Sequence, residues 1–254
     1  MSLKDSTKNR EVDAMKRSNK ILLAVGGLLA LLVVVLGGIF SYNLKCFVST
    51  GEENLRFSFN SEKGMECRDY RFSDFDAIVT RGNWRLSVTK GGNWSVKIEC
   101  DKALSKGVKV DKRGNVLYLE FSPGKKFKKK KAIASLIMPR FGGVKGEGGL
   151  DLYFEGFHGM NRLDIHFSGG LNLKGIKSDY NSLSLGIIGG GNINLRNVPI
   201  RDANVKIGGA GNVVLSMRGG ELRGVIDGAG ILTYYGNVKS RNVSINGVGK
   251  VYHR

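Results

Sequence analysis

The chain has 254 residues, of which 41% are hydrophobic and 24% are charged, and it contains 37 glycines against 3 prolines. This composition excludes a disordered chain, and 3 cysteines are too few for a disulfide-rich scaffold. With 40 Lys and Arg against 22 Asp and Glu, the net charge of +18 favours anionic partners such as lipid headgroups, acidic polysaccharide or nucleic acid, without choosing among them.

Residues 21–40, ILLAVGGLLALLVVVLGGIF, contain no charged side chain. Twenty such residues in a helix span about 30 Å, the thickness of the hydrocarbon core of a bilayer. We therefore predict a transmembrane helix over residues 21–42, because the stretch is too long for a cleaved signal peptide. Six Lys and Arg precede the span and two lie in residues 41–60, so residues 1–20 are predicted to be a cytoplasmic tail and the remainder to be exported.

Residues 43–69 lack a clear periodicity and are predicted to form a juxtamembrane linker. Residues 70–121 carry short alternating runs, such as WRLSV and VLYLEF, separated by RGN, KGGN and KRGN. A period of two predicts strands, and the glycine-containing segments predict hairpin turns. Cys100 ends one run, so we expect it to be buried in a strand, and together with Cys46 and Cys67 it allows at most one intrachain disulfide.

A dense cluster of positive charge follows in the segment GKKFKKKK, around Phe127. Its six lysines are Lys125, Lys126, Lys128, Lys129, Lys130 and Lys131. Clustered lysines repel one another and normally remain solvated in a loop. The functional alternative is a binding site for an anionic polymer or a membrane surface, where each lysine near acidic lipid contributes about 1 kcal/mol. One aromatic residue is too few for a base-stacking platform, so nucleic acid is not the expected partner.

The second half of the chain repeats a glycine-centred pattern about every 20 residues. The anchoring glycines are Gly148, Gly169, Gly191, Gly211, Gly230 and Gly249. Apolar residues recur four positions before and two positions after each anchor, and this spacing of two is a strand signature. Repeats of this length stack on one another. The predicted fold for residues 70–254 is therefore all-β, a parallel β-helix or β-solenoid of about six coils preceded by a short β-hairpin region.

The repeat does not bring catalytic groups together. The outward position three residues before each anchor holds Lys145, His166, Ile188, Gly208, Asp227 and Asn246. No such column stacks the two carboxylates that a glycosidase requires. The three histidines lie in different coils, and no Lys-Ser or Lys-Thr pair follows the glycine triplet 189–191, as a phosphate-binding loop requires. We therefore predict no enzyme activity, no cofactor and no metal site.

One outward column is polar in most repeats. It contains Asp151, Asn172, Asn194 and Thr233. Aligned asparagines can hydrogen-bond to one another as a ladder along stacked strands, which is a structural role. The same column could instead present a polar strip to sugar hydroxyls.

The segments FDAIVTRGNWRLSV, SGGLNL, GGGNINL, GGAGNVVL and DGAGILTYYG together resemble the bacterial GIN-domain family, which is described as the head domain of autotransporter adhesins. The resemblance covers residues 72–251 and rests on the GxGN corners and on the two-strand opening. It implies an all-β, right-handed helix-like fold, a place at the bacterial cell envelope and an adhesive role. The family supplies no catalytic residues that could be transferred to this chain.

We interpret the chain as a non-enzymatic envelope protein at the bacterial inner membrane, with its N-terminus in the cytoplasm and a basic β-domain in the periplasm or outside the cell. The lysine cluster is the candidate contact with an anionic envelope polymer or lipid headgroups. One alternative is a structural scaffold that forms homo-oligomers end to end or laterally, because exposed strand edges pair with other chains. A carbohydrate-active β-helix enzyme is a further alternative.

Overall fold

The computed structural model describes residues 64–127 and 130–254 of the chain. Two short 3₁₀ helices, η1 (Lys102–Gly107) and η2 (Lys125–Phe127), accompany eleven strands. The strands are β1 (Met65–Tyr70), β2 (Ala77–Lys90), β3 (Ser95–Asp101), β4 (Val108–Arg113), β5 (Val116–Phe121), β6 (Ala132–Met138), β7 (Gly143–Glu155), β8 (Met160–Ile176), β9 (Tyr180–Arg218), β10 (Glu221–Asn237) and β11 (Ser240–His253).

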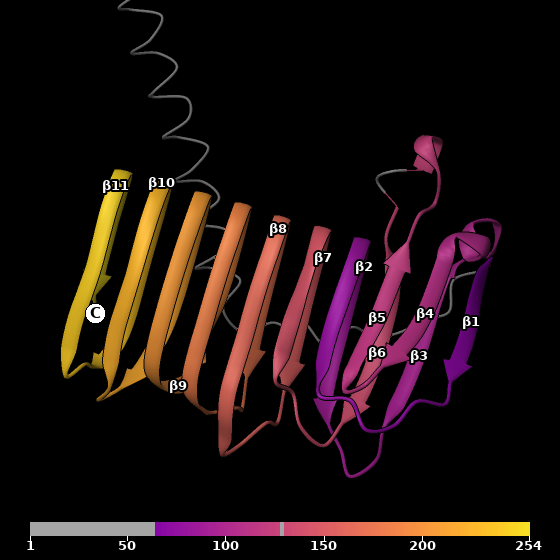
Figure 1. Cartoon of the computed structure of the whole chain (residues 1–254), viewed down its shortest axis with the longest axis horizontal. Helices are drawn as coiled ribbons and strands as arrows, with labels where there is room; N and C mark the ends of the chain where they lie inside the picture. The colour runs from indigo at the N-terminus through magenta and orange to yellow at the C-terminus, as the bar shows by residue number, and fades with distance from the viewer. Residues whose placement is uncertain (1–63, 128–129) are drawn as a thin grey trace, which may run out of the picture. The chain divides into compact units, whose positions relative to one another are not determined.

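All eleven strands belong to one mixed sheet (Figure 1). Nine of them follow the order β1-β3-β6-β2-β7-β8-β9-β10-β11, and β5 and β4 branch from β2. The strands from β7 to β11 pair in parallel with their neighbours, and β7 pairs in parallel with β2. On the other side of β2 the sheet divides, because residues 77–81 pair with β5 and residues 84–90 pair with β6. Antiparallel strands complete both branches, with β4 on β5, β3 on β6 and β1 on β3.

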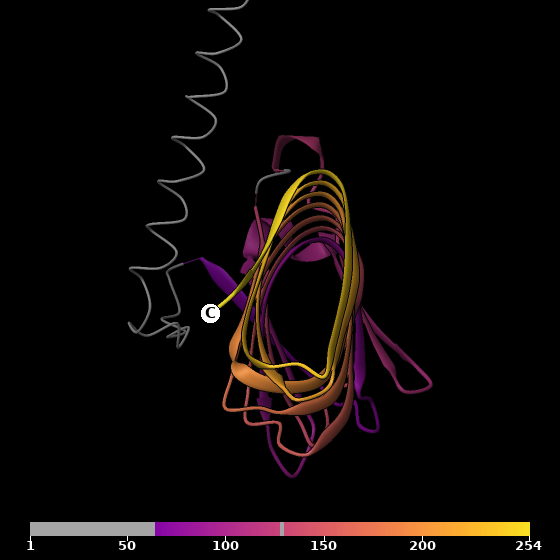
Figure 2. The same cartoon turned by 90° about the vertical axis from the view of Figure 1, so that its left-hand side faces the viewer.

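The long strands bend at glycines that lie opposite one another, which we call the bend column. It comprises Gly82, Gly148, Gly169, Gly189, Gly209, Gly228 and Gly247, whose φ angles run from 88° to 146°. Residues with a side chain rarely adopt this conformation. The strands continue through the bend without a break, so the two halves of each strand lie in different walls, as the view along the row of strands shows (Figure 2).

The bend column corrects the predicted register of the repeat. Gly148 and Gly169 do face each other, but Gly169 faces Gly189, and the predicted anchor Gly191 faces Leu171. Gly211, Gly230 and Gly249 face one another in a separate column, two residues beyond the bend. Each later repeat contains two glycines two positions apart, such as Gly189 and Gly191, and only the first has a positive φ. The spacing of the apolar residues does not show which of the two glycines lies at the bend.

The predicted fold class, a parallel β-helix or β-solenoid of about six coils behind a short hairpin region, is wrong. The described residues form a single large mixed sheet. The prediction assumed short strands that end at glycine corners, whereas β9 alone runs for 39 residues through two glycine bends. It also did not foresee that the antiparallel strands β1, β3 and β4 join the same sheet as the parallel ones. The all-β character of the domain is retained.

The prediction of a membrane anchor is also corrected. The predicted cytoplasmic tail and the transmembrane helix, residues 21–42, lie outside the described residues. Within residues 64–127 and 130–254, no helix is long and apolar enough to cross a membrane. The structure therefore does not support the predicted location at a bacterial inner membrane, and we withdraw it. The end of the predicted linker is ordered as β1, which pairs with β3.

The core lies between the walls and is filled by alternate side chains of the strands. Large aromatic residues close it at the β2 end, among them Trp84, Phe141 and Tyr180, each fully buried. Their polar atoms are satisfied: Trp84 Nε1 donates to the Arg81 carbonyl oxygen at 3.0 Å, and the Tyr180 hydroxyl donates to the Phe141 carbonyl oxygen at 3.1 Å. Cys100 is buried as predicted, and neither it nor the exposed Cys67 forms a disulfide.

Replacing Gly209 by alanine tests the bend column. Gly209 has a φ of 127°, and an added Cβ would lie 2.3 Å from the Gly189 carbonyl oxygen. We expect the free energy of unfolding to fall by about 3 kcal/mol, because backbone strain and a collision with main chain add together. Gly190→Ala is the matched control, since a Cβ there meets nothing within 4 Å. Equal urea midpoints for the two variants would contradict the assignment of the bend.

Candidate functional site

The predicted lysine cluster lies in the loop between β5 and β6, which we call the basic loop (residues 124–131). Lys125 and Lys126 form most of η2, and both are exposed. Phe127 beside them is 44% exposed, which is unusual for so large an apolar side chain. Lys128 and Lys129 lie outside the described residues. The exposed end of the basic loop is therefore cationic and carries one apolar side chain.

Local hydrogen bonds shape the basic loop. Gly124 has a φ of 84°, and its carbonyl oxygen accepts from the Phe127 backbone N–H at 3.1 Å. The Phe127 carbonyl oxygen in turn accepts from the Lys130 backbone N–H at 2.9 Å. These turns allow the chain to leave β5 and return as β6, although the two strands pair with different halves of β2.

The last two lysines of the basic loop contact carboxylates of the sheet. Lys131 Nζ lies 2.5 Å from Asp151 Oδ2, and Lys130 Nζ lies 4.0 Å from an Asp101 carboxylate oxygen. Lys125 and Lys126 form no ion pair with any residue that the structure describes. The four described lysines of the cluster therefore differ: Lys130 and Lys131 contact carboxylates of the sheet, while Lys125 and Lys126 are exposed.

The predicted polar column forms a hydrogen-bonded ladder over part of its length. Asn172 Nδ2 donates to Asp151 Oδ1 at 3.0 Å, and Asn192 Nδ2 donates to Asn172 Oδ1 at 3.4 Å. Asn192 therefore occupies the place predicted for Asn194, whose side chain instead accepts from the Arg196 backbone N–H. Because the amides bond to one another, this column has a structural role.

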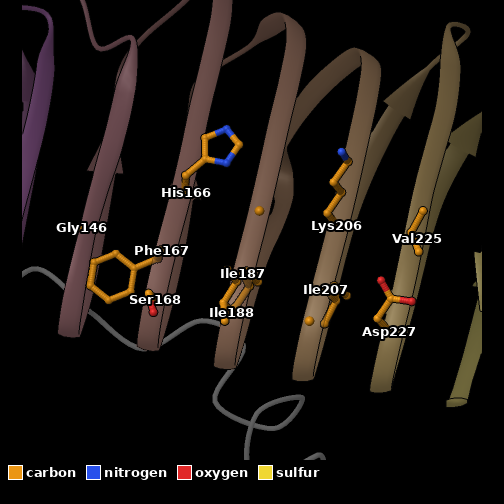
Figure 3. Close-up of a pocket in the computed structure, with 12 residues that line it drawn as sticks. Gly146, His166, Phe167, Ser168, Ile187, Ile188, Lys206, Ile207, Val225 and Asp227 are labelled. Carbon is orange, nitrogen blue, oxygen red and sulfur yellow. The ribbon is translucent and has the colours of Figure 1, made fainter. Parts of the chain in front are cut away.

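A second candidate site is a groove of about 550 Å³ on the outer face of the sheet, which we call the outer groove (Figure 3). It crosses β7, β8, β9 and β10 just before their bends. The side chains that point out of the sheet are His166, Ser168, Ile188, Lys206, Val225 and Asp227. They alternate with buried residues such as Phe167 and Ile207, whose side chains enter the core.

Glycines hollow out this part of the sheet. Gly186 faces His166 in the strand register, and Gly208 faces Asp227. The space over Gly186 is covered by the His166 ring, whereas at Gly208 no side chain fills the space, so the groove floor is low there. Ile188, which faces Ser168, is 69% exposed beside this floor. An outer face that combines an exposed isoleucine, two basic residues and a carboxylate can hold a ligand that is partly apolar and partly charged.

The sequence patterns did not identify the outer groove as a site. The predicted outward column included His166, Ile188 and Asp227, but it placed His166 and Ile188 opposite each other. The structure instead places Ser168 opposite Ile188 and Gly186 opposite His166. Lys206, which belongs to the His166 column, was missing altogether. Aligning the repeats on Gly189 instead of Gly191 would have placed the groove residues in their correct columns.

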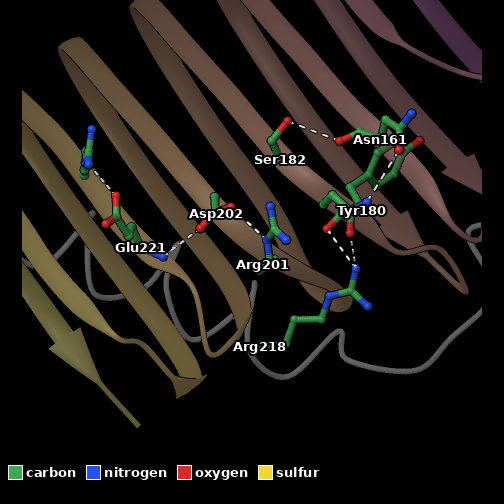
Figure 4. A network of polar contacts seen from close by, with 9 residues as sticks. Asn161, Tyr180, Ser182, Arg201, Asp202, Arg218 and Glu221 are labelled. Atoms are coloured by element: carbon green, nitrogen blue, oxygen red, sulfur yellow. Dashed lines mark hydrogen bonds and ion pairs between the residues drawn. The ribbon is translucent and has the colours of Figure 1, made fainter.

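A network of polar contacts joins successive passes of the chain near the starts of β8, β9 and β10 and at the end of β9 (Figure 4). Asp202 accepts from the Glu221 backbone N–H and from Arg201 Nε, both at 2.9 Å. Arg218 donates to the Asn181 side chain at 2.9 Å, and Ser182 donates to the Asn161 carbonyl oxygen at 3.2 Å. Each acid is satisfied by a neighbouring donor, so the network stabilises the stack of strands.

Metal binding and paired carboxylates find no support in this part of the molecule. Among the described residues, no group of three or more His, Cys, Asp or Glu side chains could hold a metal ion. Asp227 accepts a hydrogen bond from Asn246 Nδ2 at 2.8 Å, and Asp151 is occupied by Lys131. The geometry of both carboxylates is thus that of structural pairs.

Residues 74–198 match the family described as "Putative auto-transporter adhesin, head GIN domain". Over this segment the chain is similar to the GIN-domain family. The predicted resemblance is confirmed, and the match runs from just before β2 into β9 of the GIN domain. No curated protein matches the chain.

One solved structure agrees with this similarity at the level of the fold. A crystal structure described as a "putative adhesin" from Bacteroides fragilis NCTC 9343 is 18% identical to the chain, with a TM-score of 0.56, and the match covers 76% of this chain and 98% of that one. A "Putative lipid binding protein" from Parabacteroides distasonis ATCC 8503 is 16% identical, with a TM-score of 0.46, and the match covers 76% and 97%. The family and the Bacteroides fragilis structure are both described as putative adhesins.

The pKa of Asp202 gives a test of the network in Figure 4. The backbone N–H of Glu221 and the Arg201 guanidinium lower the pKa of this carboxyl in the folded protein. A lowered folded pKa stabilises the fold above the unfolded pKa of about 3.9, and this contribution is lost as the pH falls through the folded value. The free energy of unfolding should therefore fall less steeply with acid in Asp202→Asn than in the native chain. Parallel curves below about pH 5 in urea titrations would contradict the role of Asp202.

Proposed function

We propose that this GIN domain is a non-enzymatic, adhesin-like binding domain that attaches to an anionic polymer of the cell envelope through the basic loop. The observation that carries the proposal is the pair of exposed lysines, Lys125 and Lys126, next to the exposed Phe127 and without carboxylate partners among the described residues. Lysines in this setting attract anionic groups, and the net charge of +18 acts in the same direction.

The ion pairs of the basic loop support this proposal. Lys131 contacts Asp151 of β7 and Lys130 contacts Asp101 of β3, so the end of the loop is attached to these two strands. Attachment lowers the conformational entropy that the loop loses when it binds a partner. Each exposed lysine contributes up to about 1 kcal/mol to binding at an acidic surface, and salt screens this attraction.

The absence of enzyme activity is part of the proposal. Two observations support it: the family description names an adhesin, and the outward carboxylates Asp151 and Asp227 are bonded to Lys131 and Asn246. General acid–base cleavage of a glycosidic bond requires two carboxyl groups that converge on one bond.

A scaffold that associates through β11 is the second candidate. The side chain of Val248 is 83% exposed, and one side of β11 pairs with no strand of the described residues. However, residues 240–254 contain no acid, and they contain Arg241, Lys250 and Arg254. Two copies of β11 would therefore repel each other, which makes this candidate weaker than attachment through the basic loop.

Neutralising four lysines of the basic loop tests the proposed attachment. We expect a variant with Lys125, Lys126, Lys128 and Lys129 changed to glutamine to bind heparin, used as an anionic polymer, at least about tenfold more weakly at 0.05 M salt, because up to about four favourable charges are lost. Native binding should also fall steeply between 0.05 and 0.3 M salt. Surface plasmon resonance measures both effects.

The control has the same net charge. It carries glutamine at Lys174, Lys177, Lys239 and Lys250, which lie outside the basic loop. Equal weakening in the two variants would show that overall charge and not the basic loop binds the polymer. Vesicles of anionic lipid, tested beside heparin, show whether a membrane surface is bound in preference to a polymer.

A further inference from the structure

We propose that the outer groove is a second binding site, which accepts an acidic sugar unit of a linear polysaccharide. This inference rests on the proposed function for the class of partner, an anionic polymer, but it concerns different residues. The basic loop attracts any polyanion by charge. The outer groove offers charge, an apolar surface and hydrogen-bonding groups together, which is what a sugar acid requires.

The cationic part of the site lies over Gly186. His166 and Lys206 lie on either side of Gly186, two strand spacings or about 9 to 10 Å apart. The Lys206 ammonium forms no ion pair with a described residue, and the His166 ring contacts the Ser184 hydroxyl at 3.2 Å. Lys145 faces His166 in the register and extends the positive charge. Because the His166 ring lies over Gly186, a carboxylate placed between this ring and the Lys206 ammonium is within reach of both basic side chains.

The close approach of His166 depends on the missing side chain at Gly186. A Cβ at Gly186 would lie 2.6 Å from His166 Nδ1. The imidazole therefore leans over the glycine, toward the same edge of the groove as Lys206 (Figure 3). A larger residue at this position would displace the ring and fill the space for an anion.

The neighbouring column supplies the apolar and hydrogen-bonding parts. Ile188 is exposed between Ser168 and Gly208, and Asp227 follows on β10. A sugar ring has one face of C–H groups, which can pack on Ile188, and hydroxyl groups at its edge. Asn246 donates to Asp227 Oδ1. Ser168 and the other oxygen of the Asp227 carboxylate can accept hydrogen bonds from the sugar hydroxyls, and such bonds to a charged acceptor are the stronger kind.

The form of the groove favours a sugar polymer over a lipid chain. An acyl chain is best held when most of its surface is enclosed. The residues that line the outer groove come from β7, β8, β9 and β10 (Figure 3), so the groove runs across the strands and can accept a linear polymer along its length. An acyl chain also has no hydrogen-bonding groups that could pair with Asp227 and Ser168.

The experiment measures binding of short oligouronates to the full chain by calorimetry at about 0.15 M salt, which weakens simple charge attraction. Tetragalacturonate and tetramannuronate are the probes, and maltotetraose is the neutral probe of equal length. We expect one or both oligouronates to bind and maltotetraose not to bind. Lys206→Gln should weaken binding about tenfold, since a hydrogen bond to a charged group is lost.

A groove-filling variant keeps the test independent of charge. A Cβ at Gly208 meets the Ile187 carbonyl oxygen at 3.6 Å, an ordinary contact, so Gly208→Leu should fold and occupy the space beside Ile188. We expect it to abolish oligouronate binding. Gly190→Leu is the matched control, because Gly190 has open space around it and does not line the groove. It should bind like the native chain.

The outcomes separate this inference from the proposed function. Binding of neither oligouronate, equal binding of maltotetraose, or native affinity in both Lys206→Gln and Gly208→Leu overturns the groove as a sugar-acid site. Loss of oligouronate binding in the basic-loop variant, with retention in the groove variants, overturns the inference and leaves the proposed function standing. Loss of heparin binding alone in the basic-loop variant supports two separate sites.

Discussion

The positive φ angles of the bend column are the constraint on which the rest of the sheet depends. Each glycine of the column faces the next at the bend, and an added Cβ at Gly189, Gly209 or Gly228 would lie within 2.5 Å of the preceding glycine's carbonyl oxygen. The strands must therefore cross the bend in one register. That register decides which outward side chains become neighbours on the faces of the sheet, and so it decides where a ligand can bind.

Both candidate sites follow from this register by different routes. In the outer groove, glycines at Gly186 and Gly208 alternate with large side chains in adjoining columns, which leaves a hollow between charged and apolar groups. The basic loop arises where the sheet divides at β2, because the chain must cross from the β5 branch to the β6 branch. Asp151, on the strand that pairs with β2, then anchors the loop through Lys131. The strand register therefore fixes the positions of the side chains in both sites. The glycines make the outer groove accessible, and the division of the sheet at β2 makes the basic loop accessible.

Much of the local structure could be predicted from the sequence. Alternation with a period of two identified strands, the burial of Cys100 followed from its place in such a run, and the GxGN segments pointed to the correct family. The strand β1 was missed because MECRDY does not alternate, and its residues are ordered by pairing with β3. The ladder was predicted one step wrong, at Asn194, because a two-residue slip moves every outward residue to a new neighbour.

The remaining errors have a common physical cause. Apolar spacing reports which side chains are buried, but it does not report φ, so Gly189 and Gly191 were equivalent in the sequence. The division of the sheet at β2 depends on contacts between residues far apart in the chain, such as Ala77 with Val116 and Trp84 with Ala132. Patterns within a short window contain no information about such pairs. The contact of Lys131 with Asp151 depends on them as well.

Disulfide trapping of the register tests the central claim most directly. In a chain with Cys46 and Cys67 replaced by serine, cysteines are introduced at Ser168 and Ile188, which face each other, or at His166 and Ile188, which do not. Opposed Cα atoms on neighbouring strands lie within the usual range for a disulfide of about 4.4 to 6.8 Å. The account predicts that mild oxidation links the Ser168–Ile188 pair and leaves the His166–Ile188 pair reduced. Efficient linkage of His166 with Ile188 instead would contradict the register and, with it, the outer groove.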